Sequence, residues 1–227
     1  MSVRAQLLGE IRTTLLGMRS LNLSSESSAA DIYEAYVFSL AIDAADREGA
    51  VISFEDILGI STTQLVFRTS PGHIFSSQTR TQQIPYTHAV LAIPGKPELE
   101  LHQGIYVSGK SGLLHECDVA IVFRSEGQTC RSARVNPRCA RVLLAAECKF
   151  YSSGLGIGLA RAFIGLTSDL STDGRFFVSN TSSDSVRKLL THHKRQWQQD
   201  VAPPNGIVVN RLRALFENVI QEYKARY

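Results

Sequence analysis

The chain lacks both the long hydrophobic runs of a membrane protein and an apolar signal-peptide core near its N-terminus. It also lacks internal repeats and low-complexity segments. Apolar residues make up 44% and charged residues 20% of its 227 residues, which excludes the disordered and fibrous classes. We therefore expect a cytoplasmic globular protein that has no membrane partner.

The four cysteines include no CxxC pair, which argues against a zinc site. Cys117 and Cys148 lie inside strand-like runs, where a free cysteine behaves as a small buried hydrophobic residue. Cys130 and Cys139 lie in a basic segment, and the sequence leaves open whether they pair. A reducing compartment is the simplest interpretation.

Two motifs suggest nucleotide binding, but their surroundings argue against it. Residues 104–111 match the P-loop pattern GxxxxGK[ST], but strand-like residues lie on both sides and leave no room for the required helix. The context instead predicts a hairpin turn. Residues 154–158 hold three alternating glycines without the full dinucleotide spacing, so we retain them only as a contact segment. No GxSxG motif accompanies the scattered histidines.

The order of periodic segments predicts one α/β domain over residues 1–227, with a mixed sheet. It divides into N-terminal helices (1–48), a core (about 49–180) and C-terminal helices (184–227). Helices are expected at residues 3–19, 29–47, 157–170, 184–199 and 208–227. Strands are expected at residues 64–69, 86–93, 98–107, 113–122, 142–151 and 175–180.

Two of these strands carry ionisable residues within apolar runs. Asp118 lies in the first, and Glu147 and Lys149 lie in the second, where period-two alternation places them on one face. Burying such groups costs free energy that packing does not explain. If the strands pair, two carboxylates and an ammonium meet in a small volume, as a divalent-cation site for phosphate chemistry requires. The alternative is a structural ion pair, which stabilises a fold poorly.

This pattern resembles the PD-(D/E)xK nuclease superfamily, in which an acid on one strand precedes an acid, any residue and a lysine on the next. Asp118, Glu147 and Lys149 match that motif. Glu34 matches the family's helix acid, with Asp31 as its competitor one turn earlier. The resemblance implies a restriction-endonuclease-like fold, a mixed central sheet flanked by helices with an N-terminal helical segment.

The resemblance also implies a metal ion, Mg²⁺ with Mn²⁺ as a substitute, held by Asp118, Glu147 and the backbone carbonyl of Cys148. Lys149 would orient the attacking water. The sequence departs from the family pattern in three ways: Cys117 replaces the usual proline, Glu116 adds a further acid, and the long gap before Glu147 implies a hairpin extension.

Positive charge gathers in two segments, although the whole chain has a formal net charge of only +3. Residues 124–141 contain five arginines and one acid, and residues 184–199 form a basic helix. Both are typical of solvated surfaces, and both are also candidate contacts for a nucleic-acid backbone. The candidate contact residues are Arg131, Arg134, Arg138, Arg161, Lys188, Lys194 and Arg195.

The resemblance implies a metal-dependent endonuclease that hydrolyses phosphodiester bonds, with DNA favoured over RNA as the substrate. Nucleases of this type serve restriction, repair or anti-phage defence, and the resemblance implies no choice among these roles. A homodimer or a partner protein would supply specificity, because the sequence shows no recognition domain. The alternative is an inactive module that keeps the nuclease fold for nucleic-acid binding or complex assembly.

Overall fold

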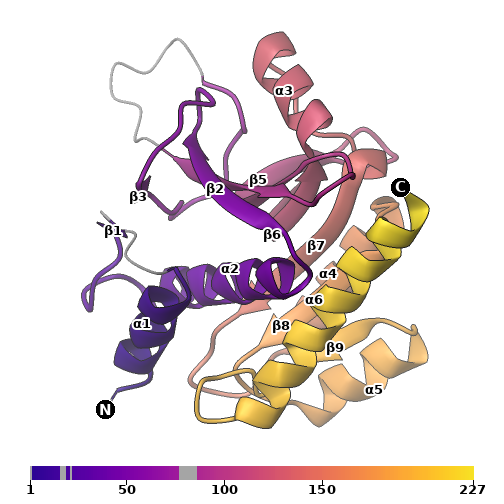
Figure 1. Ribbon diagram of the computed structural model, residues 1–227. Helices are drawn as coiled ribbons and strands as arrows, with labels where there is room; N and C mark the ends of the chain where they lie inside the picture. The colour runs from indigo at the N-terminus through magenta and orange to yellow at the C-terminus, as the bar shows by residue number, and fades with distance from the viewer. Residues whose placement is uncertain (1, 16–18, 21, 77–85) are drawn as a thin grey trace.

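A seven-stranded mixed sheet organises the molecule (Figure 1). The computed structural model describes residues 2–15, 19–20, 22–76 and 86–227. The strands lie in the order β2 (Val51–Asp56), β4 (Thr87–Ala92), β5 (Leu99–Ser108), β6 (Leu114–Phe123), β7 (Val142–Lys149), β8 (Gly174–Ser179) and β9 (Gln196–Gln198). Neighbours from β2 to β7 are antiparallel, and the pairs β7–β8 and β8–β9 are parallel. The predicted α/β class with a mixed sheet is confirmed.

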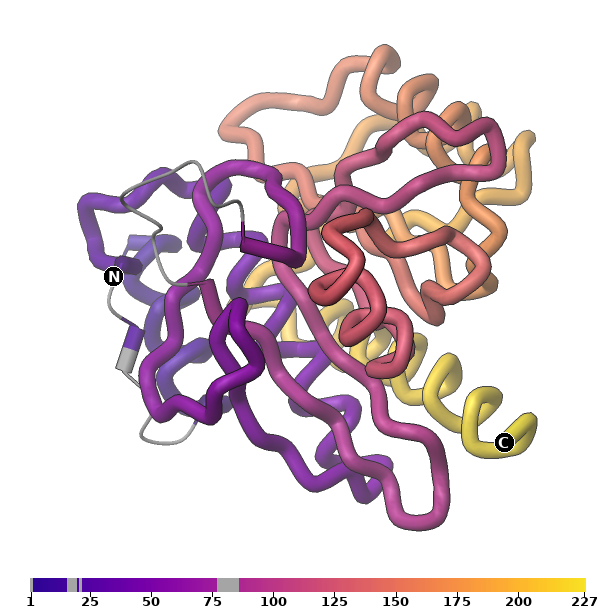
Figure 2. The backbone as a smooth tube through the Cα atoms, turned by 90° about the horizontal axis from the view of Figure 1, so that it is seen from above, coloured from indigo at the N-terminus to yellow at the C-terminus, as the bar shows by residue number. Residues whose placement is uncertain are grey.

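Helices cover both faces of this sheet (Figure 1). The first face holds α1 (Val3–Thr14), α2 (Ala29–Arg47) and α6 (Gly206–Arg226), whose apolar residues join the largest core cluster. The second face holds α3 (Arg124–Ala133), α4 (Ile157–Asp169) and α5 (Asp184–His192), which contribute to two smaller clusters. The chain ends lie at opposite sides of the molecule (Figure 2).

The central element of the first face is α2. Its N-cap is Ser28, whose hydroxyl accepts the backbone N–H of Asp31 at 3.1 Å. Alanines at positions 35, 41, 44 and 45 are fully buried and let the helix lie close to the sheet, while Tyr33 and Phe38 fill the remaining space. This close packing brings Glu34, on the same helix, toward the middle of the sheet.

Two predicted segments have a different structure. The expected hairpin extension after Asp118 is instead α3, which ends where Arg134 adopts a left-handed backbone (φ 58°), followed by a short 3₁₀ turn at Cys139–Arg141. The expected helix over residues 184–199 stops at His192. Lys194 has φ 52°, and residues 196–198 form edge strand β9, where Trp197 donates to the Ser179 hydroxyl at 2.9 Å.

Smaller differences concern the ends of elements. The predicted strand 64–69 is only β3 (Gln64–Leu65), which pairs in parallel with β1 (Arg19–Ser20). The predicted helix 3–19 ends at Thr14, and its residues 16–18 lie outside the described part. The cysteines left open in the sequence, Cys130 and Cys139, are free and buried. Within the described residues, no helix is long and apolar enough to cross a membrane.

The segment that matches the P-loop pattern is a strand and a turn, as expected. β5 continues to Ser108, the N–H of Gly109 bonds to the carbonyl of Leu113 at 2.8 Å, and β6 begins at Leu114. No helix begins at Lys110, so the amide cradle that binds phosphates in a P-loop is absent from this segment.

Candidate functional site

The candidate site lies where strands β6 and β7 separate. Their antiparallel pairing ends at Val119 opposite Ala146, and Asp118 and Glu147 are the next residue on each strand. Asp118 Oδ2 then accepts the backbone N–H of Cys148 at 2.6 Å. We call this place the fork and define it by Glu34, Asp118, Glu147 and Lys149. Because the strands diverge here, side chains can approach backbone that would otherwise be paired.

Lys149 joins the two acids of the fork. Its Nζ lies 2.6 Å from Glu147 Oε1 and 3.4 Å from Asp118 Oδ2. Asp118 is almost fully buried, whereas the Glu147 and Lys149 side chains keep 21% and 22% of their exposure. The predicted alternation along β7 is confirmed, because Ala146 and Cys148 belong to the core cluster on the α2 side and Glu147 and Lys149 lie on the other face. Asp118, Glu147 and Lys149 therefore lie together, and solvent reaches them through the partly exposed Glu147 and Lys149.

A local irregularity in the sheet accompanies the fork. Leu101 of β5 belongs to the first core cluster, but Ile105 and Val107 belong to the second, so the strand exchanges its buried face between these positions. Gly104 lies there with φ 60°, a backbone conformation that favours glycine. It stands between the residues that pair with Val119 and Cys117, so it is opposite Asp118.

Glu34 reaches the fork from α2. Gln103 Nε2 of β5 lies 3.4 Å from Glu34 Oε2 and 3.2 Å from the backbone oxygen of Arg68, so it positions this half-buried carboxyl. Asp31, the competitor predicted from the sequence, lies in the first turn of α2. Its charge is the weakest of the influences on Glu34, whereas that of Asp118 is among the strongest. This geometry favours Glu34 as the helix acid.

The carboxyl groups of the fork are short of positive charge. Burial, followed by the charge of Asp118, raises the pKa of Glu34 to about 8. Burial also raises the pKa of Asp118, and burial together with Asp118 raises those of Glu147 and Glu116. Burial alone would lower the pKa of Lys149, but the Asp118 and Glu147 carboxylates outweigh it and raise that pKa, so the ammonium stays charged.

These donors suit a hard divalent cation. Asp118 and Glu147 supply carboxylate oxygens and Cys148 supplies a backbone carbonyl, which are ligand types that Mg²⁺ accepts. Burial and the repulsion between the carboxylates raise their pKa values, and a bound cation would offset both effects. The acids of the fork do not, however, form a group of three ligand atoms within 4.8 Å of one another; among the residues described, only Glu55, His88 and Glu100 do so. Instead, the Lys149 ammonium lies between the carboxylates of Asp118 and Glu147.

The predicted nucleic-acid contacts fall into two groups. Arg161, Lys188 and Lys194 are exposed on α4, on α5 and just after α5. Arg195 is half-buried and lines a hollow of about 340 Å³ together with Trp197.

The three arginines from residues 131 to 138 are engaged with protein groups. Arg131 forms an ion pair with buried Glu100 and keeps only 13% exposure. Arg138 bonds to Glu126 at 2.6 Å, although its side chain is exposed, and Arg134 donates to the backbone oxygen of Ser76 at 3.1 Å. Of these, Arg131 is the least accessible to a phosphate group.

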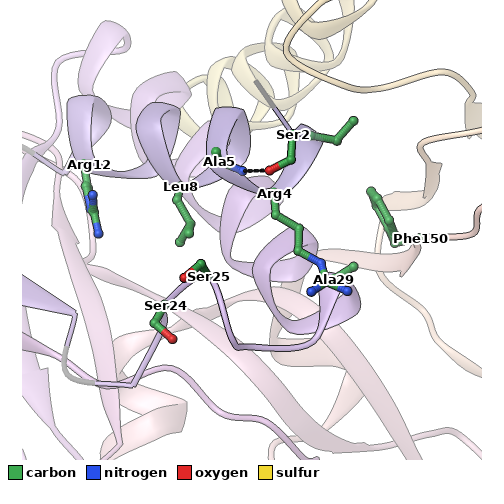
Figure 3. Close-up of a pocket in the computed structure, with 10 residues that line it drawn as sticks. Ser2, Arg4, Ala5, Leu8, Arg12, Ser24, Ser25, Ala29 and Phe150 are labelled. Atoms are coloured by element: carbon green, nitrogen blue, oxygen red, sulfur yellow. Dashed lines mark hydrogen bonds between the residues drawn. The ribbon is translucent and has the colours of Figure 1, made fainter.

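A hollow of about 750 Å³ lies between α1 and the start of α2 (Figure 3), and none of the four fork residues lines it. Phe150, the residue after Lys149, forms one wall and lies 5.4 Å from the Tyr33 ring, centroid to centroid. Exposed Arg4 and Arg12 line the hollow, and Arg4 extends toward Ala29 in the figure. Sequence reasoning missed both arginines, because nothing local connects the first helix with the end of β7.

Sequence reasoning also missed Gln103 and the group of Glu55, His88 and Glu100. The alternation of Leu99, Leu101 and Gln103 places the amide on the α2 side and could have indicated it. The other three residues come from three different strands, and Glu55 lies 33 positions before His88, so only the pairing of the strands reveals them.

Comparisons of the chain with protein-family models, curated protein sequences and solved structures found no match. The likeness to PD-(D/E)xK nucleases therefore depends on the motif residues themselves.

Proposed function

We propose that the protein is a metal-dependent nuclease that hydrolyses phosphodiester bonds at the fork. The observation that carries this proposal is the meeting of Asp118, Glu147 and Lys149 where β6 and β7 separate, with Glu34 added from α2. Four ionisable groups at a break in a buried sheet are costly for stability. A phosphate–cation substrate complex would use all four.

Asp118 and Glu147 would hold the cation, with the carbonyl of Cys148 as a further ligand. When bound, Mg²⁺ polarises the scissile phosphate and lowers the pKa of a coordinated water. Lys149 stays protonated, so its ammonium stabilises the charge that develops on the phosphate oxygens. Its present contact with Glu147 shows that Nζ can approach the position of a ligand oxygen.

Glu34 adds the capacity to move a proton. A general base works best when its pKa lies near the operating pH, and burial together with Asp118 raises the pKa of Glu34 to about 8. Its carboxylate would accept the proton of the attacking water, oriented by Gln103. Lys149 is unsuited to this role because its pKa is raised.

The substrate proposed is DNA. Exposed Arg161, Lys188 and Lys194, which lie on or next to α4 and α5, would contact the phosphate backbone. Such contacts carry no base information, which agrees with a chain that obtains its specificity from a second copy or a partner protein.

Cleavage assays on plasmid DNA, single-stranded DNA and RNA with Mg²⁺ or Mn²⁺ test the proposal. We expect Lys149→Ala and Asp118→Asn each to lower the cleavage rate at least 100-fold, the size expected for losing a main electrostatic group. Matched controls are Lys110→Ala and Asp184→Asn, which change exposed residues away from the fork and should cleave like the wild type. Equal cleavage by Lys149→Ala and Lys110→Ala rules the proposal out.

A non-catalytic binding module is the second candidate, favoured by the close ion pairs of Lys149 with both acids. A binding module would retain nucleic acid without metal, and Glu147→Gln would leave its affinity unchanged. Filter binding in the presence of a chelator separates the two functions, because cleavage requires the cation and simple backbone binding does not.

A further inference from the structure

The second group of ionisable residues lies on β2, β4 and β5, next to strands β6 and β7 of the fork, on the face covered by α3. Glu55 of β2 is paired directly with His88 of β4, and Glu100 of β5 lies diagonally beside His88, since Val90 pairs with Glu100. Residues 55, 88 and 100 thus come from three adjacent strands. We call them the β2–β5 cluster. Their ligand atoms all lie within 4.8 Å of one another.

His88 is the unusual member of this cluster. Its side chain is completely buried, and neither ring nitrogen has a hydrogen-bond partner. A buried polar atom without a partner costs about 1–3 kcal/mol, so most such atoms are paired. The Nε2 atom nevertheless faces two carboxylate oxygens, Glu55 Oε2 at 3.7 Å and Glu100 Oε1 at 3.8 Å.

These separations are too long for hydrogen bonds and fit two ligands of one ion. Nitrogen and oxygen ligands each about 2.1 Å from Zn²⁺ lie roughly 3.4–3.7 Å apart at tetrahedral to trigonal angles. We propose that Glu55, His88 and Glu100 bind one zinc-class divalent ion, which would hold β2, β4 and β5 together and leave a fourth position for water.

The surrounding residues support the ligands as an outer shell. Arg124 bonds to Glu55 Oε1 at 2.7 Å, which leaves Oε2 toward His88. His102 Nε2 donates to Glu100 Oε2 at 3.0 Å, and Arg131 donates to both Glu100 oxygens. Such contacts orient metal-binding carboxylates.

The same arginines decide which ion fits. Arg124 and Arg131 already balance the two carboxylates, so charge alone would not attract a hard ion such as Mg²⁺. Imidazole nitrogen suits zinc and similar ions, and the buried ring is neutral because burial, followed by His102, lowers its pKa to about 2. Arg124 also pairs with Glu98 at 3.2 Å, so it keeps a partner if Glu55 turns toward the ion.

One member of the cluster, Glu55, lies at a surface hollow. Glu55, Arg124 and Arg131 line a hollow of about 580 Å³ that separates β2 from α3. At its inner side, any side chain at position 127 of α3 would collide with the Glu100 carboxylate, so glycine there lets the helix cover the cluster closely. The spacing of the cysteines argues only against a cysteine-bound zinc, and this cluster contains no cysteine.

The test uses the full chain, freed of metal with a chelator and titrated with zinc sulfate in a calorimeter. Wild type and the fork variant Asp118→Asn/Glu147→Gln should each bind about one Zn²⁺ per chain. Glu55→Gln and His88→Gln should weaken binding at least tenfold, whereas Glu98→Gln, which changes the other partner of Arg124, should not. X-ray absorption of the zinc complex should show one imidazole with oxygen ligands and no sulfur.

Three outcomes overturn the proposal: no saturable binding by the wild type, equal affinity in the wild type and Glu55→Gln, or binding that disappears only in the fork variant. The last would place the ion at the fork. Should His88→Gln fail to fold, the surface-accessible Glu55→Gln and the absorption spectrum still decide. This inference is independent of the nuclease proposal, because the fork variant should lose cleavage and keep zinc binding. Cleavage by the fork variant would contradict the nuclease proposal alone, and loss of zinc binding in the wild type would contradict the zinc proposal alone.

Discussion

Buried acids occur at two places in the sheet, and the positive charge around them differs. At the fork, Lys149 faces Asp118 and Glu147, and the pKa values of these carboxyl groups and of Glu34 are raised. In the β2–β5 cluster, hydrogen bonds from His102 and Arg131 outweigh burial and lower the pKa of Glu100 to about 2. Both places bury carboxylates, but only the fork lacks enough internal cations.

The comparison shows that burial of an acid does not by itself indicate a catalytic site. A carboxylate with a bidentate arginine partner contributes to the fold, whereas one that shares a single lysine with another acid still needs a cation. This difference supports Mg²⁺ at the fork, where charge attracts the ion, and a zinc-class ion at the cluster, where the free imidazole is the distinguishing ligand.

The largest effect on stability is expected from breaking the charge balance of the cluster. Arg131→Ala leaves Glu100 charged, buried and short of its main partner, so the free energy of unfolding should fall by about 3–5 kcal/mol at neutral pH. Urea denaturation measures this change. Arg134→Ala, the exposed neighbour on the same segment, is the control and should cost less than about 1 kcal/mol.

The same variant has a defined pH dependence. The pKa of Glu100 is lower in the folded chain than in the unfolded chain, so its stabilisation is present above about pH 4.5 and is lost as the pH falls toward 2. The difference between the wild type and Arg131→Ala should therefore narrow in acid. If Arg131→Ala is as stable as Arg134→Ala at pH 7, the charge balance inferred for the cluster is wrong.

The fork should show the opposite sign. The pKa of Glu34 is raised from 4.5 to about 8, so folding favours its protonated form, and this stabilisation is present below pH 4.5 and lost as the pH rises through 8. Glu34→Gln should therefore be more stable than the wild type above pH 8, by on the order of 1–3 kcal/mol. Thermal denaturation from pH 4 to 9 without divalent cations measures the difference. Glu10→Gln, an exposed acid on α1, should show no such trend.

The smallest effect is expected at the residue that positions Glu34. Gln103 donates a hydrogen bond to the Glu34 carboxylate and thereby lowers its pKa. Gln103→Leu should raise that pKa further, by a fraction of a unit, and the Glu34 side-chain NMR signal should titrate at a correspondingly higher pH. An unchanged titration would mean that Asp118 and burial alone set the proton affinity of Glu34.

The motif residues were recognisable in the sequence because they interrupt two apolar runs. Asp118, Glu147 and Lys149 stand within apolar runs, where an ionisable group is conspicuous, and a two-residue period places Glu147 and Lys149 together. The helix that carries Glu34 was also predictable, since α2 is long and strongly periodic. The chemistry assigned to these residues stays a prediction.

Local pattern failed where tertiary contacts override it. The basic segment after β6 was expected to be a hairpin extension, yet it forms α3, because Gly127 and Cys130 pack against the sheet and Arg131 reaches Glu100. Similarly, residues 196–198 continue a polar, basic pattern but pair with β8 as its edge strand. In both cases the deciding partner lies outside the segment.

The sequence by itself determined the α/β class, the order of the main elements and the strand motif, because each depends on periodicity within a short stretch. Only the tertiary structure decided which charges are neighbours. It paired Arg131 with Glu100 instead of solvent, oriented Glu34 through Gln103, and assembled Glu55, His88 and Glu100 from three strands. The physical reason is strand pairing: it sets contacts between residues dozens of positions apart, and no local period records them.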